Sequence, residues 1–551
     1  MFQGRSSSKY VGQVFRSAAG LPPGAPRRSA AAGRKACPTL ALIVLLSSAS
    51  GFAAPRCDVA DAAMQRNGDA VRALIEKKAD VNAPQADGTT ALDWVARWDD
   101  SEMAGLLIRA GANVQAANGD GATPLFLATE NGSAAMIETL LKGGADVNAP
   151  VLPHGETALM MAARSGHVDA VKVLLDHGAQ MNVQDNLRGT TALMWAAEQG
   201  HAAVVQLLTD RGADVRIQST ALTPPGRRGL GYANSNVVFG ASGRAAAKVP
   251  SKGGVTALLL AVREGSLDCV QILVAKGADV NQAAVDGSGP LLVAVQNGHY
   301  DIARFLLDHG ADAKLTNAKG WTPLYLAVKN RNQESTAIPG PSNDGVLDCI
   351  TALLDHGADP NSRIKADTEV HQGMTALWLR EAGATPLLRA ALSGDLTVIR
   401  LLLARHADPQ IPTLDHTTPL MVAAGVGWAE GMMHEYSEEE TMEVVKLLLD
   451  LGANVNAAND HGITALHGAA YKGADKVVEL LVDRGAKLDA TDNGEDYGFG
   501  ARTVKMTPLN WAEGVPIGMA SAIYHKDTVA LLTRMMQERG IPVQTNAQAM
   551  K

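Results

Sequence analysis

The sequence predicts an all-α repeat solenoid, a fold in which copies of one helical unit stack into an elongated array. The first reason is a repeated segment whose opening threonine returns at intervals of 33, 34 and 34 residues over the first four copies. Self-similarity at this period is typical of stacked repeats. The second reason is composition, because 46% of the residues are hydrophobic while only 4% are aromatic. Many small aliphatic side chains suit a long, thin core that neighbouring units build together.

The unit opens with a threonine, then proline or alanine, then leucine. This opening recurs at Thr90, Thr123, Thr157, Thr191, Thr256, Thr322, Thr385, Thr418, Thr464 and Thr507, and Gly289 holds its place in one more copy. Residues 58–83 add a twelfth copy that keeps only the second half of the pattern. The sequence therefore predicts about twelve stacked units.

Each unit is expected to contain two short helices. The opening threonine can accept a hydrogen bond from a free amide at a helix start, and prolines such as Pro124 follow where a missing N–H costs nothing. Glycines that readily take the left-handed conformation mark the end of this first helix. They are Gly132, Gly166, Gly200, Gly265, Gly298, Gly394 and Gly473.

A second helix is predicted directly after the glycine. Its apolar face is expected to carry Val168, Val171, Leu174 and Leu175. Alanine pairs such as Ala162-Ala163 leave little bulk, so that two helices can lie close together. Turn signals such as Asn118-Gly119 and Asp286-Gly287 then suit a tight reversal. The predicted unit is helix, turn, helix and an extended hairpin finger.

This pattern resembles the ankyrin repeat family, and the resemblance covers about residues 58–540. The chain departs from the family in the histidine that usually follows Thr-Pro-Leu. Only His467 keeps it, whereas Met160, Met194, Met421, Phe126 and Tyr325 replace it. The departure concerns local hydrogen bonding at the base of the fingers and leaves the predicted fold unchanged.

The family resemblance implies a scaffold that binds another protein through its finger tips and the exposed end of the first helix, on the concave side. In this chain those positions hold Arg97, Trp98, Glu130, Arg164, Glu198, Arg263, Trp321, Tyr325, Lys329 and Tyr471. Tryptophan, tyrosine and arginine are the residues most often found as binding hot spots. The alternative for each residue is local packing.

Several segments interrupt the period. They lie near residues 219–252, 333–345, 364–382, 425–441, 492–505 and 514–526. The first is basic, since no acidic residue occurs between Asp214 and Glu264, and the fourth is acidic. Long surface loops cost little closure entropy, so these segments are expected to be insertions. Residues 541–551 are expected to form a flexible tail.

Residues 1–54 have the layout of a secretory signal peptide. Basic residues up to Lys35 precede the apolar run 40–46, and small residues follow as far as Ala54. We expect cleavage near Ala54 or Pro55, which leaves no membrane span in the mature protein. The alternative is an uncleaved leader that anchors the chain, although serines interrupt the apolar run short of the ~20 residues that a span needs.

Cysteine and histidine are expected to have structural roles. Cys269 and Cys349 occupy equivalent positions two units apart, so their sulfur atoms should lie roughly 20 Å apart, too far for a disulfide. They are therefore expected to be buried free thiols. Histidines such as His167, His201 and His177 lie at helix ends, where the helix dipole favours them.

The sequence offers no catalytic residue, cofactor or metal site. It contains no Cys-x-x-Cys or Gly-x-Ser-x-Gly motif and no pair of histidines at the spacing of zinc proteases. A net charge of -8 argues against general nucleic-acid binding. We therefore expect an exported, non-enzymatic scaffold with an unknown protein partner. Alternatives are a membrane-tethered envelope scaffold, or an enzyme or toxin with a site in the insertions.

Overall fold

The structure is a computed structural model that describes residues 58–152, 154–220, 253–332, 345–368, 379–428, 437–494, 504–515 and 523–546. The chain divides into residues 1–55 and residues 56–551, and all described residues lie in the second unit. The predicted signal peptide, residues 1–54, therefore lies outside the described residues.

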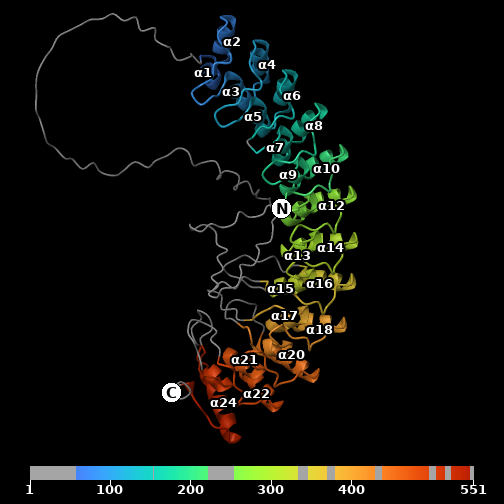
Figure 1. Cartoon of the computed structure of the whole chain (residues 1–551), viewed down its shortest axis with the longest axis vertical. Helices are drawn as coiled ribbons and strands as arrows, with labels where there is room; N and C mark the ends of the chain where they lie inside the picture. Colours follow the sequence, from blue (N-terminus) through green and yellow to red (C-terminus); the bar gives the residue numbers. More distant parts are fainter. Residues whose placement is uncertain are drawn as a thin grey trace, which may run out of the picture. The chain divides into compact units, whose positions relative to one another are not determined.

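The described residues form pairs of helices, one pair per repeat (Figure 1). The first helices are α1 (Asp58–Met64), α3 (Ala91–Trp98), α5 (Pro124–Asn131), α7 (Ala158–Ser165), α9 (Ala192–Glu198), α11 (Ala257–Glu264), α13 (Pro290–Gln296), α15 (Pro323–Arg331), α17 (Pro386–Ser393), α19 (Pro419–Ala424), α21 (Ala465–Lys472) and α23 (Pro508–Ala512).

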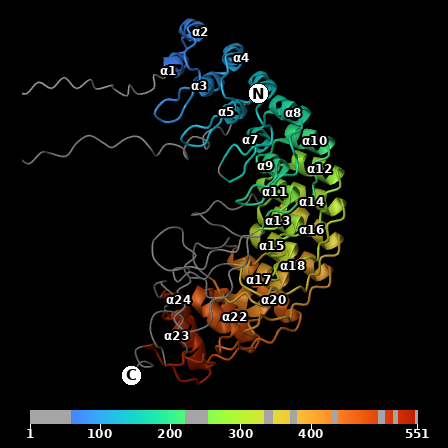
Figure 2. The same ribbon diagram turned by 45° about the horizontal axis from the view of Figure 1, so that its top comes forward.

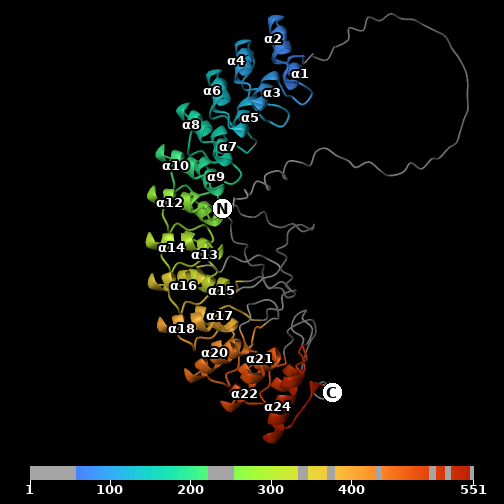
Figure 3. The same cartoon turned by 180° about the vertical axis from the view of Figure 1, so that it is seen from behind.

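The second helices follow them in alternation. They are α2 (Gly68–Glu76), α4 (Ser101–Arg109), α6 (Ala134–Lys142), α8 (Val168–Asp176), α10 (Ala202–Asp210), α12 (Leu267–Ala275), α14 (Tyr300–Asp308), α16 (Val346–Asp355), α18 (Leu396–Ala404), α20 (Glu438–Asp450), α22 (Asp475–Asp483) and α24 (Lys526–Glu538). Each first helix packs on the first helix of the next repeat and on its own second helix. The two kinds of helix form two parallel rows, as Figures 2 and 3 show.

The predicted solenoid of about twelve helical pairs is thus confirmed, with one difference at its beginning. The sequence of residues 58–83 keeps only the second half of the repeat pattern, yet α1 forms a complete first helix there. Val59, Ala60 and Ala63 of α1 are buried. Contact with α3 stabilises this helix without the usual threonine cap, because burial of an apolar face outweighs the missing cap.

The predicted helix caps are present. Thr123, for example, accepts a hydrogen bond from the backbone N–H of Phe126 at 3.2 Å. The seven glycines predicted to end the first helices all have positive φ values, such as 79° at Gly166. At that glycine an added Cβ would lie 2.7 Å from the ring of His201, so the turn needs glycine for space as well as for its backbone conformation.

Histidines at the turns join neighbouring repeats, which agrees with the structural role predicted for them. The Nε2 atoms of His201 and His299 lie 3.0 and 3.2 Å from the carbonyl oxygens of Arg164 and Arg263 in the preceding first helices. His177 instead lies at the end of α8, with its Nε2 atom 2.8 Å from Glu138 Oε2.

The fingers pack by backbone hydrogen bonds rather than as regular strands. Among the described residues the only β-bridge pairs Pro150 with Thr157. The tight turn predicted at Asn118-Gly119 is present and spans residues 118–121. The N–H of Gly121 bonds the carbonyl of Asn118 at 2.9 Å, and Gly121 has the positive φ. Gly119 instead donates at 2.6 Å to the carbonyl of Asp87 in the preceding finger.

The core consists of small side chains from both rows of helices. Ala162, Ala163, Val171 and Leu174 are all fully buried. Val168 is an exception to the predicted apolar face, since 37% of it is exposed. It is the first residue of α8, and the buried face of this helix consists of Ala170, Val171 and Leu174.

Both predicted structural cysteines are buried and free. Burial raises the pKa of Cys349 to about 12 and also raises the pKa of Cys269, although a hydrogen bond from Ser266 partly opposes it there. A thiol with a raised pKa remains protonated at neutral pH and is a poor nucleophile.

The predicted interruptions coincide in part with residues outside the described ranges. In the acidic segment 425–441, however, residues from Glu438 onward belong to α20, whose N-cap Ser437 bonds the N–H of Glu440 at 3.2 Å. Acidic residues in a first turn stabilise a helix, so this part of the segment lengthens α20. The described part of the predicted tail is also tied down, because Asn546 Nδ2 donates to the carbonyl of Asn510 at 3.1 Å.

Candidate functional site

Three positions in the first helix decide which side chains a partner can reach. Counted from the opening threonine, the third position points into the stack in nearly every repeat. Its buried residues are Asp93, Met160, Met194, Leu259, Leu292, Tyr325, Leu388, Met421, His467 and Asn510. The fourth position is partly buried at Trp94 and Trp195 and buried in several other repeats. At the seventh position Arg97, Glu130, Arg164 and Arg263 are exposed, as the sequence predicted, and Glu198 is partly buried.

Tyr325 is a correction to the predicted set. Its side chain is completely buried, and its hydroxyl donates to Glu381 Oε1 at 3.2 Å. Tyr325 occupies the third position, where the family pattern has a histidine and where this chain otherwise buries methionine or leucine. Burial and the nearby charge of Glu381 raise the pKa of the tyrosine well above its ordinary value. Its expected exposure was wrong because this position faces the next repeat.

Lys329 is also buried, although it occupies the seventh position. It lies in the last turns of α15, which are fastened to neighbouring helices. Arg331 forms an ion pair of 2.7 Å with Asp395, and Asn330 donates to the carbonyl of Val295 at 2.7 Å. These contacts hold the end of α15 inside the stack, so the prediction that Lys329 is exposed was wrong.

Tyr471 and Trp321 are covered by neighbouring segments. The ring of Tyr471 makes edge contacts with Trp428 at 6.1 Å and Trp511 at 5.9 Å, and the residue is buried. Trp321 is only partly buried, but it does not project freely from a finger tip. Its Nε1 donates to the carbonyl of Ala366 at 3.0 Å, and the Lys319 ammonium lies 4.4 Å from its ring. Neighbouring segments therefore limit access to both residues.

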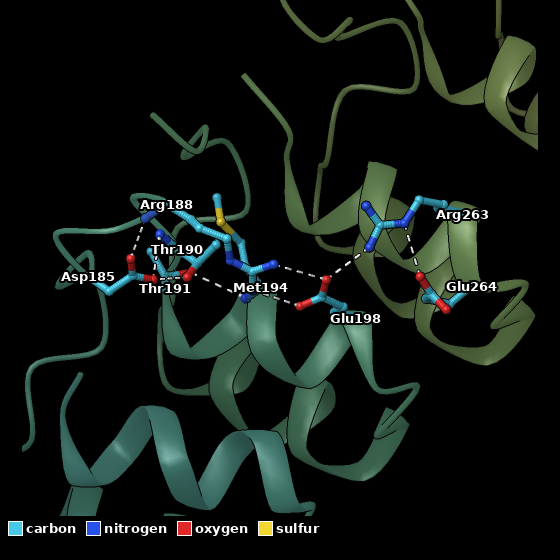
Figure 4. Close-up of polar contacts among 8 residues, drawn as sticks. All are labelled: Asp185, Arg188, Thr190, Thr191, Met194, Glu198, Arg263 and Glu264. Atoms are coloured by element: carbon cyan, nitrogen blue, oxygen red, sulfur yellow. Dashed lines mark hydrogen bonds and ion pairs between the residues drawn. The ribbon is translucent and has the colours of Figure 1, made fainter. Parts of the chain in front are cut away.

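The structure brings Arg164, Glu198 and Arg263 together with two residues that the sequence did not single out, Arg188 and Trp195. These five residues are called the Trp195 cluster below. Glu198 accepts from Arg188 Nη2 and from Arg263 Nη2, each at 2.9 Å (Figure 4). Three consecutive first helices and one finger supply these side chains, so the cluster exists only in the stacked protein.

The two arginines keep Glu198 ionised. Burial opposes its ionisation, but hydrogen bonds and charge from Arg188 and Arg263 outweigh it and lower the pKa of the carboxyl. Arg263 also donates from Nε to Glu264 at 3.0 Å. Hydrogen bonds and charges of both glutamates outweigh burial there and raise the pKa of the guanidinium. The cluster is therefore a fixed set of charges at neutral pH.

Arg188 is positioned by its own finger. The Asp185 carboxylate accepts from the backbone N–H of Arg188 at 2.6 Å and of Thr190 at 3.1 Å, and it also binds the Thr190 hydroxyl (Figure 4). An aspartate that binds backbone amides ahead of it fixes a turn. This turn directs the Arg188 guanidinium onto Glu198 of the adjoining helix.

Trp195 lies between two guanidinium groups. Those of Arg164 and Arg188 lie 4.8 and 4.6 Å from its ring. Its indole Nε1 is shielded from solvent and forms no hydrogen bond with a described residue. Arg164 is exposed and has no ion pair with a described residue, so its charge remains available beside the Trp195 ring.

A second aromatic group lies at the beginning of the solenoid. Trp94 and Trp98 of α3 stack with their ring centroids 5.7 Å apart. The guanidinium of Arg66 lies 4.1 Å from the Trp98 ring, and that of Arg97 lies 6.0 Å from the Trp94 ring. The four residues are called the tryptophan array below. Trp98 and Arg97 belong to the predicted set, whereas Trp94 and Arg66 do not.

The missed residues differ in how far the sequence could have revealed them. Trp94 and Trp195 are both at the fourth position, one helical turn before the predicted Arg97 and Glu198, so their spacing was a usable signal. Arg188 and Arg66 carry no such signal. Arg188 depends on the finger turn, and Arg66 depends on a turn with a positive φ of 55°.

The described residues contain no group of three or more histidine, cysteine, aspartate or glutamate side chains that could hold a metal ion. None of the described helices is long and apolar enough to cross a membrane. The groups that stand out on the first-helix side are thus arginine, glutamate and tryptophan side chains at fixed positions.

Comparison with known proteins agrees with the geometry. A family model described as ankyrin repeats (3 copies) matches residues 59–151, 150–219, 258–364 and 387–492, more than half of the chain. Human ankyrin repeat and KH domain-containing protein 1 is 40% identical over 107 residues, which is 19% of this chain and 4% of that protein. Human neurogenic locus notch homolog protein 2 is 32% identical over 151 residues, 27% of this chain and 5% of that protein.

A bacterial relative is a putative ankyrin repeat protein of Rickettsia bellii (strain RML369-C). It is 34% identical over 107 residues, 19% of this chain and 29% of that protein. The chain thus spans less than a third of the length of each of these three relatives, and the similarity is one of repeats. Stacked repeats of this kind are scaffolds for binding other proteins. On its family match and the twelve helical pairs of its described residues, the chain belongs to the ankyrin repeat family.

Proposed function

We propose that this protein is an exported, non-enzymatic scaffold whose partner binds the first-helix side of the repeats from α3 to α11. The proposal rests on the way in which the exposure of the seventh helix position changes along the chain. It is exposed at Arg97, Glu130, Arg164 and Arg263, and it is buried at Lys329 and at Tyr471. The N-terminal repeats therefore present their helix ends to solvent.

The Trp195 cluster supports a contact role for this surface. A side chain that is already fixed loses little conformational entropy when a partner binds it. Arg164 and Arg188 are held against Trp195, and Glu198 holds Arg188 and Arg263. Arginine and tryptophan are also the residues most enriched in binding hot spots. We place the centre of the partner's footprint at Arg164 and Trp195.

Capture of the native partner tests the proposal. Crosslinking in the native envelope, followed by mass spectrometry, is compared for the wild type and for the variant Arg164→Ala, Trp195→Leu. Leucine is chosen because Leu127 and Leu260 hold the same helix position in other repeats. We expect the variant to lose most of the captured partner, by about tenfold or more, at a nearly unchanged melting temperature.

The matched control is Lys172→Ala, an exposed change on the second helix α8. It should leave capture unchanged. If the Arg164 and Trp195 variant still captures the partner while Arg227→Ala, Arg228→Ala does not, the basic insertion near 219–252 is the contact surface. The assignment to the first-helix side would then be wrong.

Export is the second part of the proposal and rests on the order of basic, apolar and small residues in positions 1–54. N-terminal sequencing of the protein from the cell envelope or medium should find a chain that starts near Ala54 or Pro55. A chain in the membrane fraction that still carries residues 40–46 would support the membrane-tethered alternative instead.

A further inference from the structure

The first two repeats enclose a pocket of about 230 Å³ at their turns. Val71, Val95 and Met103 supply apolar walls, and Arg66, Trp98 and Asp100 supply polar groups and an aromatic surface. A volume of this size holds about one large aliphatic side chain with some water. The pocket lies directly beside the tryptophan array, since Arg66 and Trp98 belong to both.

The turn at the pocket differs from the corresponding turns of four other repeats. In four other repeats a histidine is the N-cap of the second helix, namely His167, His201, His299 and His525. Those rings lie against the turn glycine of the preceding repeat. In the second repeat the N-cap is Asp100, whose short side chain accepts from the N–H of Met103 at 3.0 Å. The facing turn of the first repeat also differs, because Arg66, with a positive φ of 55°, takes the place of the turn glycine and its side chain lines the pocket.

Two guanidinium groups beside the pocket can bind an anionic ligand, whereas the carboxylate of Asp100 already accepts from the N–H of Met103. Arg66 and Arg97 lie at the two ends of the tryptophan array, and neither forms an ion pair with a described residue. Each guanidinium lies near an aromatic ring, which leaves N–H groups free to bind a carboxylate. The indole Nε1 of Trp98, shielded from solvent, also has no acceptor among the described residues. A carbonyl or carboxylate brought by a ligand would satisfy these donors.

We propose that the pocket and the tryptophan array together dock an acidic segment of a protein partner. One aliphatic side chain of the segment enters the pocket, and flanking carboxylates bind Arg66 and Arg97. This inference rests on the proposed scaffold function and adds the chemical class of the partner. Residues 1–57 of the chain itself do not fit as the occupant, because they contain no aspartate or glutamate and many arginines.

A phage-displayed library of random peptides, selected on the full-length mature protein, tests this proposal. We expect enrichment of peptides that combine aspartate or glutamate with a leucine, isoleucine or methionine. A synthetic peptide from that family should bind at least about tenfold more weakly when its acidic residues are replaced by asparagine and glutamine. The same loss is expected with the protein variant Arg66→Ala, Arg97→Ala.

Two substitutions of Asp100 distinguish the effect of filling the pocket from the effect of removing the negative charge. Asp100→His adds a ring at the position where four other repeats carry one, and it should narrow the pocket. Because the facing turn holds Arg66 instead of glycine, circular dichroism first checks that the variant is folded. The substitution also removes a negative charge, which by itself would favour an acidic ligand. We expect Asp100→His to weaken peptide binding about tenfold or more, while Asp100→Asn, which removes the charge and keeps the space, binds as well as wild type or better.

Three outcomes would overturn the inference. They are a library without an acidic family, acidic peptides whose binding Asp100→His does not change, and preferential binding of basic peptides or of a synthetic peptide spanning residues 1–57. If the selected peptides depend on Arg164 and Trp195 instead, the scaffold function stands and only this docking site falls.

Discussion

Glu198 of α9 and Arg263 of α11 form an ion pair with 2.9 Å between Oε1 and Nη2, although 65 residues separate them in the chain. The helices α9 and α11 are direct neighbours, as in any other consecutive pair of repeats. The basic insertion, which falls in the finger between these repeats, therefore does not separate the two helices. The same ion pair joins the two repeats on the first-helix side.

Glu198→Gln should destabilise this junction. The side chain is only 14% exposed, and glutamine cannot balance the charges of Arg188 and Arg263. We expect a loss of about 1 to 3 kcal/mol at pH 7. Because the pKa of Glu198 is lowered in the folded protein, this stabilisation is complete above the ordinary value of 4.5 and disappears as the pH falls through the lowered value. Thermal melts of both proteins at neutral and acidic pH measure the difference.

Glu102→Gln is the control for that measurement. Glu102 also pairs with an arginine, Arg72, at 3.0 Å, but its side chain is 78% exposed. Exposed ion pairs contribute little, so its melting temperature should stay close to wild type. Equal effects of the two substitutions would show that the Trp195 cluster is no more than surface charge.

Deletion of residues 221–252 should leave the repeats intact. Across the insertion the N–H of Gly254 bonds the carbonyl of Ser219 at 3.0 Å, as the N–H of Gly287 bonds that of Ala284 at 2.9 Å. The deletion leaves Thr220 and Gly253 between these partners, the same number of residues as in the finger of Ala284. Stability should change by less than ~1 kcal/mol. Loss of a cooperative melt would show instead that the inserted residues pack against the repeats.

Asp93→Asn should make the protein less sensitive to pH between about 4 and 6. Asp93 is completely buried, its Oδ1 has no partner among the described residues, and burial raises its pKa to about 6 despite hydrogen bonds from Thr90. A raised pKa means that the protonated acid stabilises the fold below its ordinary value of 3.8 and that this stabilisation is lost as the pH rises through about 6.

Asparagine resembles the protonated acid at every pH. The variant should therefore gain stability relative to wild type by up to about 3 kcal/mol between pH 4 and pH 7, at 1.36 kcal/mol per pKa unit. Melting temperatures of the two proteins measured across this range give the result. A difference that does not vary with pH would mean that Asp93 is ionised in the fold throughout.

Leu174→Ala tests the packing of α8. Leu174 is fully buried in the core between repeats, so the truncation leaves a cavity and should cost about 2 to 5 kcal/mol. Val168→Ala on the same helix is the comparison, because that residue is 37% exposed and should cost much less. A melting curve unchanged by Leu174→Ala would contradict the assignment of this helix face to the core.

The candidate surface was only partly predictable from the sequence. The exposure of Arg97, Arg164 and Arg263 follows from counting seven residues past the opening threonine. The count works there because the same helix position has the same orientation in each of these repeats. The same count fails at Lys329 and Tyr471, where contacts from other repeats bury the position. Tyr325 was predicted to be exposed but is buried, because it occupies the third position, which faces the next repeat.

The sequence by itself determined the period, the helix caps, the turn glycines and which residues belong to which repeat. These features depend on residues close together in the chain. Only the tertiary structure decided which surface remains open. The meeting of Arg188, Glu198 and Arg263 requires a finger turn and two stacked helices, and the pocket beside Trp98 is lined by residues from the turns of two successive repeats. Such contacts join different repeats, so no single copy of the pattern contains them.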